Sequence, residues 1–178
     1  MRMKSPCCDR LEDNGIGSKD MAKKEDKTNV MRLLEQKGIA YQSYAVDNMT
    51  TNAREVAKTL GAPPEHLYKT LVTVGKSGEH YVFMVPAENE LDLKKAAKAV
   101  GEKSIEMLPQ KQLLPLTGYI HGGCSPIGMK KQFLTTIHCN AKQAEHIFFS
   151  AGKIGRQVCL PPQQLEKMLL LQYQDIIK

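Results

Sequence analysis

The sequence predicts one domain of the mixed α/β class, with a partly antiparallel sheet that is curved or barrel-like and flanked by helices. Segments with helical periodicity gather in the first part of the chain and at its end, whereas segments rich in β-branched and aromatic residues occur in pairs joined by short turns. Strands joined by tight turns run antiparallel, which argues against a regularly alternating parallel sheet. A length of 178 residues, 42% of them hydrophobic and 25% charged, suits a single well-buried domain.

Capping and turn residues delimit the elements of the first half. Thr28 and Asn52 can cap helix N-termini, and Gly38 and Gly61 follow the last apolar position of each helical pattern. The turn at 75–78 begins and ends with glycine and joins two apolar runs, which is typical of a β-hairpin. We therefore predict helices over 28–38 and 51–61, and strands over 39–46, 68–74 and 80–85.

The second half continues with helical patterns and short apolar runs. An amphipathic helix over 91–100 is closed by Gly101, and its inward stripe is expected to contain Leu93, Ala96, Ala97 and Val100. Residues 104–114 have the pattern of a further, irregular helical piece. Three apolar runs, a last strand and a C-terminal helix then follow, over 118–121, 133–138, 146–149, 157–160 and 161–173.

Residues 1–20 differ from the rest of the chain. They contain four basic and four acidic residues, so the net charge of +6 belongs entirely to residues 21–178. They have no apolar stretch of the kind found in a secretory signal. We expect residues 1–20 to be a flexible leader, or an artefact of cloning or of the start codon, and residues 21–178 to form the domain.

Composition narrows the class of protein. No apolar run is long enough to cross a bilayer, and the five cysteines, an odd number without a secretory signal, are expected to be reduced thiols in the cytoplasm. The histidine and cysteine spacings match no common zinc motif, so we expect neither metal nor cofactor. The net charge of +6 is compatible with binding of a polyanion such as nucleic acid, but many enzymes without such a partner are equally basic.

The segment 122–131 carries the most informative motif. It places three glycines, a proline and two lysines in ten residues, directly after a short apolar run. Glycine lets another molecule approach the main chain, and exposed amides beside cations suit a carbonyl oxygen or a phosphate. An ordinary surface turn has a similar composition. Other residues must therefore support a functional interpretation.

Lys69, Tyr44 and the segment 150–156 are further candidates. Lys69 shares a strand face with apolar residues, which is unusual unless it lies at the exposed start of the strand or serves a function. The segment 150–156 is a second glycine-rich turn that carries cations. The hydroxyl of Tyr44 could close a pocket, although a structural tyrosine is the commoner case. The chain has no serine elbow, zinc-protease motif, phosphate-binding loop or dinucleotide fingerprint. Any reaction must then depend on positioning and electrostatics, which suits an activated substrate such as an ester.

Five motifs occur in an order that resembles the YbaK/EbsC family of free-standing aminoacyl-tRNA deacylases, relatives of the editing domain of bacterial prolyl-tRNA synthetases. The resemblance covers about residues 28–178. The motifs are Tyr68-Lys69-Thr70-Leu71, the helix segment 91–98, Thr117-Gly118-Tyr119, Gly122-Gly123-x-Ser125-Pro126-x-Gly128-x-Lys130-Lys131, and Ser150-x-Gly152-Lys153-x-Gly155.

The resemblance implies hydrolysis of the mischarged ester Cys-tRNA(Pro), with the substrate thiol attacking its own ester and no protein nucleophile. It implies that Lys69, Gly122 and Gly123 act on the ester, Lys69 by holding the 3′-terminal adenosine or its phosphate and the loop amides by stabilising the oxyanion. The acceptor end of tRNA(Pro) would be the partner, with prolyl-tRNA synthetase as a second one. Implied pocket residues are Tyr44, Ser125, Pro126, Gly128, Ser150 and Gly152, and implied tRNA contacts are Lys130, Lys131, Lys153 and Arg156.

Two alternatives remain open at this point. One is a deacylase for Ala-tRNA(Pro), and the other is a tRNA- or nucleotide-binding module without activity. The chain also departs from the family pattern, because Cys124, Ala151 and Ile154 stand where an aliphatic residue, a glycine and an arginine are usual. We interpret Cys124 as a packing replacement. Arg156 could restore the charge that is missing at Ile154.

Overall fold

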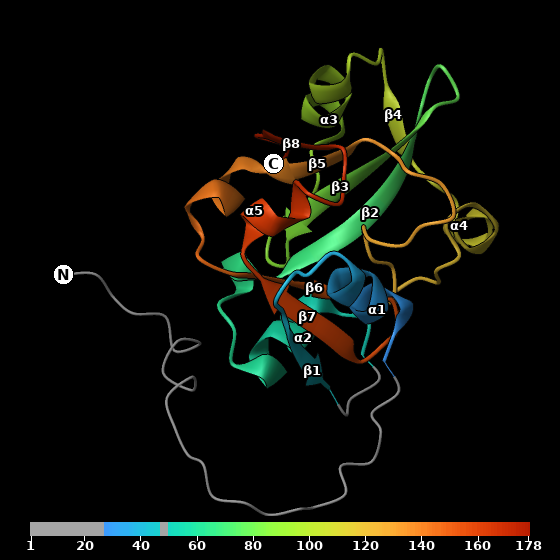
Figure 1. Cartoon of the computed structure of the whole chain (residues 1–178). Coiled ribbons are helices and arrows are strands. Elements are labelled where there is room, and N and C mark those ends of the chain that lie inside the picture. The colour runs from blue at the N-terminus through green and yellow to red at the C-terminus, as the bar shows by residue number, and fades with distance from the viewer. Residues whose placement is uncertain (1–26, 47–49) are drawn as a thin grey trace, which may run out of the picture.

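Two β-sheets with helices around them form the core of the computed structural model (Figure 1), which describes residues 27–46 and 50–178. The predicted leader over residues 1–20 lies outside the described residues. Within the described part of the chain the predicted mixed α/β class is confirmed, and the sheets do not close into a barrel. The two sheets are linked by a single parallel bridge between Leu67 and Phe148.

The larger sheet is mixed and has the strand order β4-β2-β3-β5-β8. Its strands β2, β3 and β4 are antiparallel, whereas β5 runs parallel to β3 and β8 parallel to β5. The predicted hairpin is confirmed as β2 and β3. The bounds are β2 Tyr68–Gly75, β3 His80–Pro86, β4 Ile105–Met107, β5 Thr135–His138 and β8 Leu171–Gln174.

The smaller sheet is antiparallel and has the order β1-β7-β6. Its strands are β1 Gln42–Ala45, β6 Ile147–Ser150 and β7 Arg156–Leu160. Alternate residues of β7 face two different apolar clusters: Val158 and Leu160 belong to the main core, and Cys159 packs with Val56 of the second helix. This face of the smaller sheet, covered by that helix, holds the candidate site.

Two helices begin at the caps that the sequence predicts. Thr28 and Asn52 accept hydrogen bonds from backbone N–H groups of the first turn, and Asp92, which was not predicted as a cap, does the same for a third helix. Gly61 and Gly101 close two of the helices in the left-handed conformation. The helices are α1 Asn29–Gln36, α2 Ala53–Leu60, α3 Leu93–Val100, α4 Gln110–Thr117 and α5 Pro162–Leu165, with 3₁₀ turns η1 Pro64–His66 and η2 Cys139–Gln143.

The predictions for residues 104–121 and 161–173 are partly wrong. The predicted helix over 104–114 is divided at Pro109 into strand β4 and helix α4, because proline disfavours helical backbone at the residue before it. The apolar run 118–121 forms no strand. The C-terminal helix stops at Leu165, and residues 171–174 instead pair with the edge of β5. The inward position expected for Leu93 is also wrong, since its side chain is 40% exposed.

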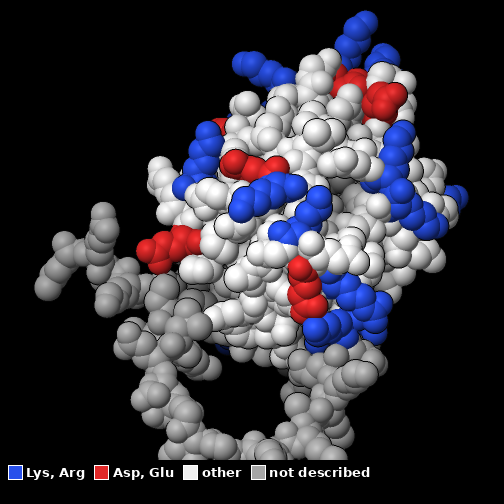
Figure 2. Space-filling model, in the orientation of Figure 1, with Lys and Arg blue, Asp and Glu red and all other residues white. Residues whose placement is uncertain are grey.

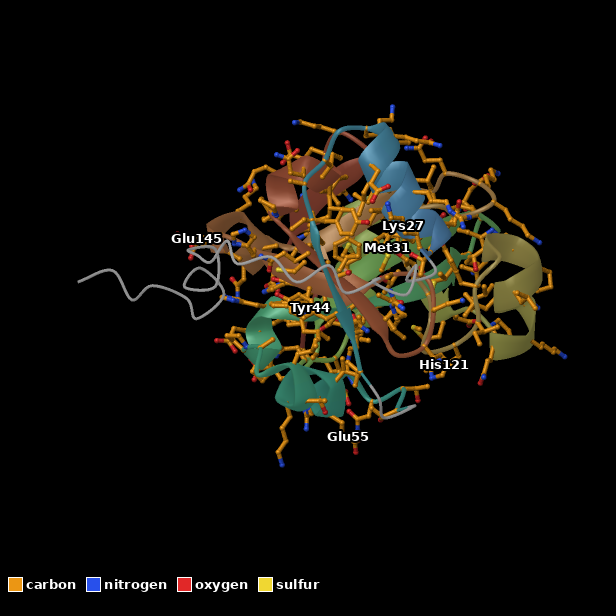
Figure 3. The ribbon with its side chains drawn as sticks, turned by 60° about the horizontal axis from the view of Figure 1, so that its bottom comes forward. Lys27, Met31, Tyr44, Glu55, His121 and Glu145 are labelled. Carbon is orange, nitrogen blue, oxygen red and sulfur yellow. The ribbon has the colours of Figure 1, made fainter. Side chains whose placement is uncertain are left out.

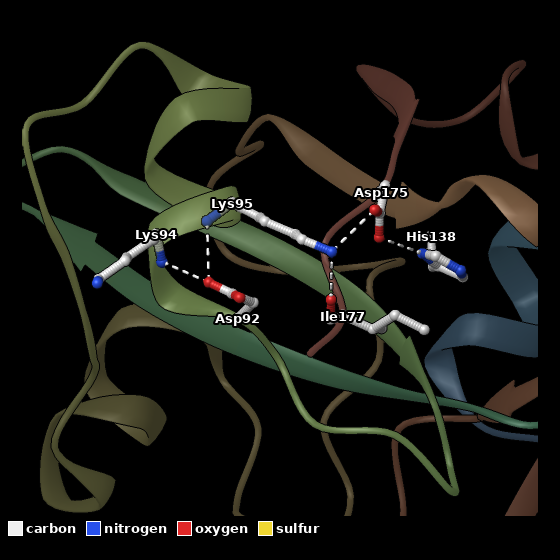
Figure 4. Close-up of polar contacts among 6 residues, drawn as sticks. All are labelled: Asp92, Lys94, Lys95, His138, Asp175 and Ile177. Atoms are coloured by element: carbon white, nitrogen blue, oxygen red, sulfur yellow. Dashed lines mark hydrogen bonds and ion pairs between the residues drawn. The ribbon is translucent and has the colours of Figure 1, made fainter.

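The C-terminal segment is fastened to the start of α3 by polar contacts (Figure 4). Lys95 Nζ lies 2.9 Å from Asp175 Oδ2 and donates a hydrogen bond to the carbonyl of Ile177. His138 Nδ1 lies 3.8 Å from Asp175 Oδ1, and burial lowers the pKa of His138 while Asp175 opposes that shift. Ile176 is fully buried between these contacts. The segment thereby holds the loop after β3 in place, next to the candidate site.

Candidate active site

A cavity of about 530 Å³ lies where the two sheets meet. Its walls come from the N-terminal end of α2, from β2, from the β4–α4 segment, from the loop after α4 and from the ends of β6 and β7. The lining includes Thr51, Asn52, Arg54, Leu67 to Val72, Glu90, Met107, Leu108, Leu113, His121, Gly122, Cys124, Ser150 and Gln157. A volume of this size accommodates a ligand considerably larger than a single small amino acid.

Strand register aligns four polar side chains across both sheets. Leu67 is bridged to Phe148 in parallel, so Lys69 and Ser150, each two residues further on, lie at the same level on the same face. Ser150 is paired with Gln157, and Gln157 with Tyr44. The row Lys69, Ser150, Gln157 and Tyr44 therefore faces α2. The first three of these residues line the cavity.

Lys69 is a half-buried cation at the wall of this cavity. Desolvation lowers the pKa of its ammonium group below the ordinary value of 10.5. The carboxylate of Glu90 opposes this effect, and the guanidinium of Arg54 adds to it. A partly desolvated ammonium group binds an anionic or carbonyl oxygen more strongly than an exposed lysine does.

We predict that neighbouring charges shift the pKa of Lys69 in opposite directions. Replacement of Glu90 by glutamine removes a stabilising charge and should lower the pKa further, whereas replacement of Arg54 by alanine should raise it. The Lys69 Cε resonance, followed by NMR during a pH titration, should have its midpoint below 10.5 in the unchanged protein.

The opposite signs of the two shifts provide an internal control for this titration. A shift of Lys69 in the same direction for both variants would contradict the electrostatic description of the site.

A side chain has little room at positions 122 and 123, because the Thr51 side chain lies against the first and the backbone of residues 153 and 154 against the second. Gly122 has a φ of +84°, and an added Cβ would lie 2.3 Å from Thr51 Cγ2. At Gly123 an added Cβ would lie 3.1 Å from the backbone nitrogen of Ile154. The loop is thus inserted between the start of α2 and the second glycine turn. This packing holds the main chain of Gly122 at the cavity wall.

Several predicted pocket residues lie behind the loop and not at the cavity. Ser125 and Pro126 are buried, and Ser125 Oγ accepts a hydrogen bond from Ile127 N–H. Gly128 and Gly152 approach the Tyr119 ring from two sides, where an added Cβ would lie 2.8 Å and 2.9 Å from its atoms. Of the residues that the sequence suggested for the pocket, Ser150 alone lines the described cavity.

Tyr44 lies at the end of the aligned row and does not line the cavity. Its hydroxyl donates a hydrogen bond to Gln42 Oε1 at 2.6 Å, and its ring packs against Phe148. Figure 3 labels Tyr44 on β1 and His121 well apart from it, toward α4. His121 belongs to the cavity although the sequence did not single it out.

The four predicted tRNA contacts lie outside the cavity lining. Lys130, Lys131 and Lys153 are exposed and Arg156 is half-buried, with its backbone N–H donating to the carbonyl of Lys153. The face drawn in Figure 2 carries basic side chains in small groups separated by acidic and uncharged surface. On that face, positive charge does not form one continuous patch.

Sequence reasoning assigned no role to several polar lining residues. Arg54 and Glu90 set the charge around Lys69, and Thr70 and Gln157 each have a buried side-chain oxygen without a hydrogen-bond partner among the described residues. The polar Gln157 at the start of an otherwise apolar strand was the one available signal. Cys124 also lines the cavity, and burial raises the pKa of its thiol to about 12, which suits the packing interpretation.

Within residues 27–46 and 50–178, no group of three metal-ligating side chains occurs, and no helix is both long and apolar enough to cross a bilayer. Beside the charged side chains of Arg54 and Glu90, the cavity offers a half-buried ammonium group, main-chain groups of a glycine loop and neutral polar side chains. These are the groups that bind and polarise an ester.

The fold and this cavity define an aminoacyl-tRNA editing domain. The chain matches the aminoacyl-tRNA editing domain family over residues 47–168 and belongs to that family. It is 46% identical over 160 residues to an Enterococcus faecalis protein described as "Putative Cys-tRNA(Pro)/Cys-tRNA(Cys) deacylase EbsC", covering 88% of this chain and 98% of that relative. The predicted relation to the YbaK/EbsC deacylases is confirmed, and with it the class of enzyme, an editing hydrolase.

Solved structures support the same fold. One, described as a "putative trans-editing enzyme for prolyl tRNA synthetase", has a TM-score of 0.76 and 26% identity, and the match covers 84% of this chain and 94% of that one. The hypothetical protein APE2540 has a TM-score of 0.75 with 17% identity, covering 84% of this chain and 99% of its own. The second likeness concerns the fold alone.

Proposed function

We propose that this protein hydrolyses mischarged Cys-tRNA(Pro) in trans, releasing cysteine and free tRNA. The observation that carries the proposal is the cavity itself, which combines Lys69 with the main chain of Gly122 and the side chain of Ser150. The proposal draws its substrate from the similarity to the Enterococcus faecalis relative and to the trans-editing protein.

The attacking group in this proposal is the thiol of the substrate. Ser150 Oγ accepts a hydrogen bond from Gly152 N–H, and among the described residues no hydrogen bond joins it to a histidine or a carboxylate. The raised pKa of Cys124 keeps that thiol protonated near neutral pH. Neither side chain has the partner that activates a protein nucleophile.

The chemistry then proceeds in two balanced steps. The cysteinyl sulfur forms a bond to its own ester carbonyl carbon, and the bond from that carbon to the ribose oxygen breaks. The thiol proton ends on the ribose hydroxyl, which leaves free tRNA and a cysteine thiolactone. Water hydrolyses the thiolactone to cysteine. Lys69 and the backbone amides of Gly122 and Gly123 stabilise the negative charge on the tetrahedral intermediate.

Hydrolysis of the mischarged ester adds a second selection step after the synthetase has chosen its amino acid. A synthetase pocket built for proline gains little discrimination against a side chain of similar size. Selection by thiol chemistry does not depend on size. It also spares Pro-tRNA(Pro), which has no thiol to attack its own ester.

The proposed partner is the acceptor end of tRNA(Pro), bound in the cytoplasm by the domain over residues 21–178. Lys130, Lys131 and Lys153 are exposed and could contact phosphates outside the cavity. Recognition of the rest of the tRNA by prolyl-tRNA synthetase, which would hand over its product, is part of the same proposal.

The test is deacylation of Cys-tRNA(Pro), Ala-tRNA(Pro) and Pro-tRNA(Pro) by the purified protein. We expect rapid loss of cysteine alone. Preferential loss of alanine would replace the proposed substrate and exclude the thiol-assisted route. Binding of tRNA without hydrolysis of any ester would instead indicate a non-catalytic binding module.

A further inference from the structure

The cavity follows the edge of strand β2. Six consecutive residues, 67 to 72, line it. Side chains of a strand alternate between its two faces, so a cavity on one face would contact every second residue only. A cavity lined by all six must lie beside the strand, where the main chain is accessible.

Thr70 turns its backbone N–H and C=O toward this edge. In an antiparallel pair, both backbone groups of a residue point to the same side, and successive residues alternate. Val82 of β3 is paired with Val72 of β2, and its N–H donates to the carbonyl of Leu134 on the β5 side. The backbone groups of Val72 therefore point away from β3, and its carbonyl accepts a hydrogen bond from Leu108 N–H. Thr70, two residues earlier, has the orientation of Val72.

No strand of the described chain pairs with Thr70 on that side. The ladder between β2 and β4 extends from Gly75 to Thr73, and the bridge to the β6 segment is at Leu67, although β6 also lies close to the start of β2. Thr70 therefore lies between the end of one ladder and the bridge to the other strand. Its side-chain oxygen is also buried without a hydrogen-bond partner among the described residues. On the side away from β3, the backbone N–H and C=O of Thr70 thus take part in no ladder among the described residues.

The wall beside this gap is apolar. Met107, Leu108 and Leu113 line the cavity next to β2, and Met107 is 46% exposed. The charged lining residues Lys69, Arg54 and Glu90 come from β2, α2 and the loop after β3, whereas the apolar ones come from β4, α4 and the residues between them. One region of the cavity therefore suits an ester and its ribose, and the other suits a flat group with polar atoms on its rim.

We infer that the edge of β2 at Thr70, with the wall of Met107, Leu108 and Leu113, binds the terminal adenine of the tRNA. The 6-amino group of adenine donates to the Thr70 carbonyl, and a ring nitrogen accepts from the Thr70 N–H. Unpaired bases are commonly recognised by such hydrogen bonds along one edge and by apolar contact on one face. The inference rests on the proposed function, because the aminoacyl ester is attached to the ribose of that adenosine.

Replacement of the terminal adenosine by inosine tests this subsite. Inosine carries a carbonyl oxygen where adenine has its amino group, so it would oppose the Thr70 carbonyl. We expect kcat/KM for Cys-tRNA(Pro) ending in inosine to fall about 10- to 100-fold. Equal hydrolysis of the two substrates would overturn the adenine subsite and leave the proposed deacylase function intact.

A binding measurement separates the subsite from the reaction. In NMR titrations, AMP should shift the amide resonance of Thr70, and IMP at the same concentration should shift it much less. If AMP binds in this way and no ester is hydrolysed, the subsite stands and the proposed function fails. Equal effects of AMP and IMP, or shifts confined to other regions, would overturn the subsite.

Two exposed side chains give matched variants for the apolar wall. Met107 lines the cavity, whereas Leu114 on α4 is 51% exposed and does not line it. Met107→Ala should weaken AMP binding several-fold, and Leu114→Ala should leave it unchanged. If both variants bind AMP with the affinity of the unchanged protein, adenine does not lie against Met107, and the proposed placement of the base is wrong.

Discussion

Replacing Lys69 by alanine is expected to lower kcat/KM for Cys-tRNA(Pro) by on the order of 100-fold or more, the typical effect of removing one group that stabilises the oxyanion. The half-buried ammonium group lies on the cavity wall, and among residues 27–46 and 50–178 no other lysine lines that cavity. The measurement is steady-state deacylation with subtraction of the spontaneous loss of the ester.

Folding should survive this substitution. Burial already disfavours the charged form of Lys69, so its removal deletes an ion that is costly to desolvate. We expect the free energy of unfolding of Lys69→Ala to change by no more than about 1 kcal/mol. Lys69→Met, which keeps the apolar stem, should be equally inactive, and Lys98→Ala on the exposed face of α3 should be fully active. An active Lys69→Met variant would exclude the cation from the mechanism.

Replacing Gly122 by alanine should both destabilise the protein and reduce deacylation. A residue with a side chain at a φ of +84° costs about 1–2 kcal/mol in strain. The added Cβ would also lie 2.3 Å and 2.9 Å from Thr51 Cγ2 and Cβ. Thr51 Cβ is fixed to the backbone, so the loop and the start of α2 must separate, which costs about a further 1–3 kcal/mol. Urea denaturation measures the sum.

Gly78 provides a control for the strain alone. Its φ is +90°, and an added Cβ would meet no atom within 4 Å. Gly78→Ala should therefore be less destabilising than Gly122→Ala and should leave deacylation unchanged. Thr51→Ser, which removes Cγ2, should partly restore the Gly122→Ala variant in a double-mutant cycle. Equal losses of stability for the two glycine variants would show that the close approach of Thr51 does not matter.

The outcomes at β4 and β8 explain which predictions from sequence succeed. Asn52 and Gly61 act within one helical turn, so their neighbours in the sequence determine the ends of that helix. The hairpin of β2 and β3 likewise depends on a short turn. Residues 171–174 alternate between apolar and polar side chains, which is a strand pattern that the prediction of a continuous C-terminal helix overlooked, and β5 supplies the strand partner.

The same distinction applies to the site. The order of motifs in the sequence by itself determined the family and singled out Lys69, Ser150 and the glycine loop. The tertiary structure alone decided that Gln157 lies between Ser150 and Tyr44, that Tyr44 stays outside the cavity, and that Thr70 lies between the β4 ladder and the bridge to β6. Caps and turns are set by interactions between near neighbours. Strand register and the edges that remain open depend on contacts between segments far apart in the chain, and those contacts form only when the whole core packs.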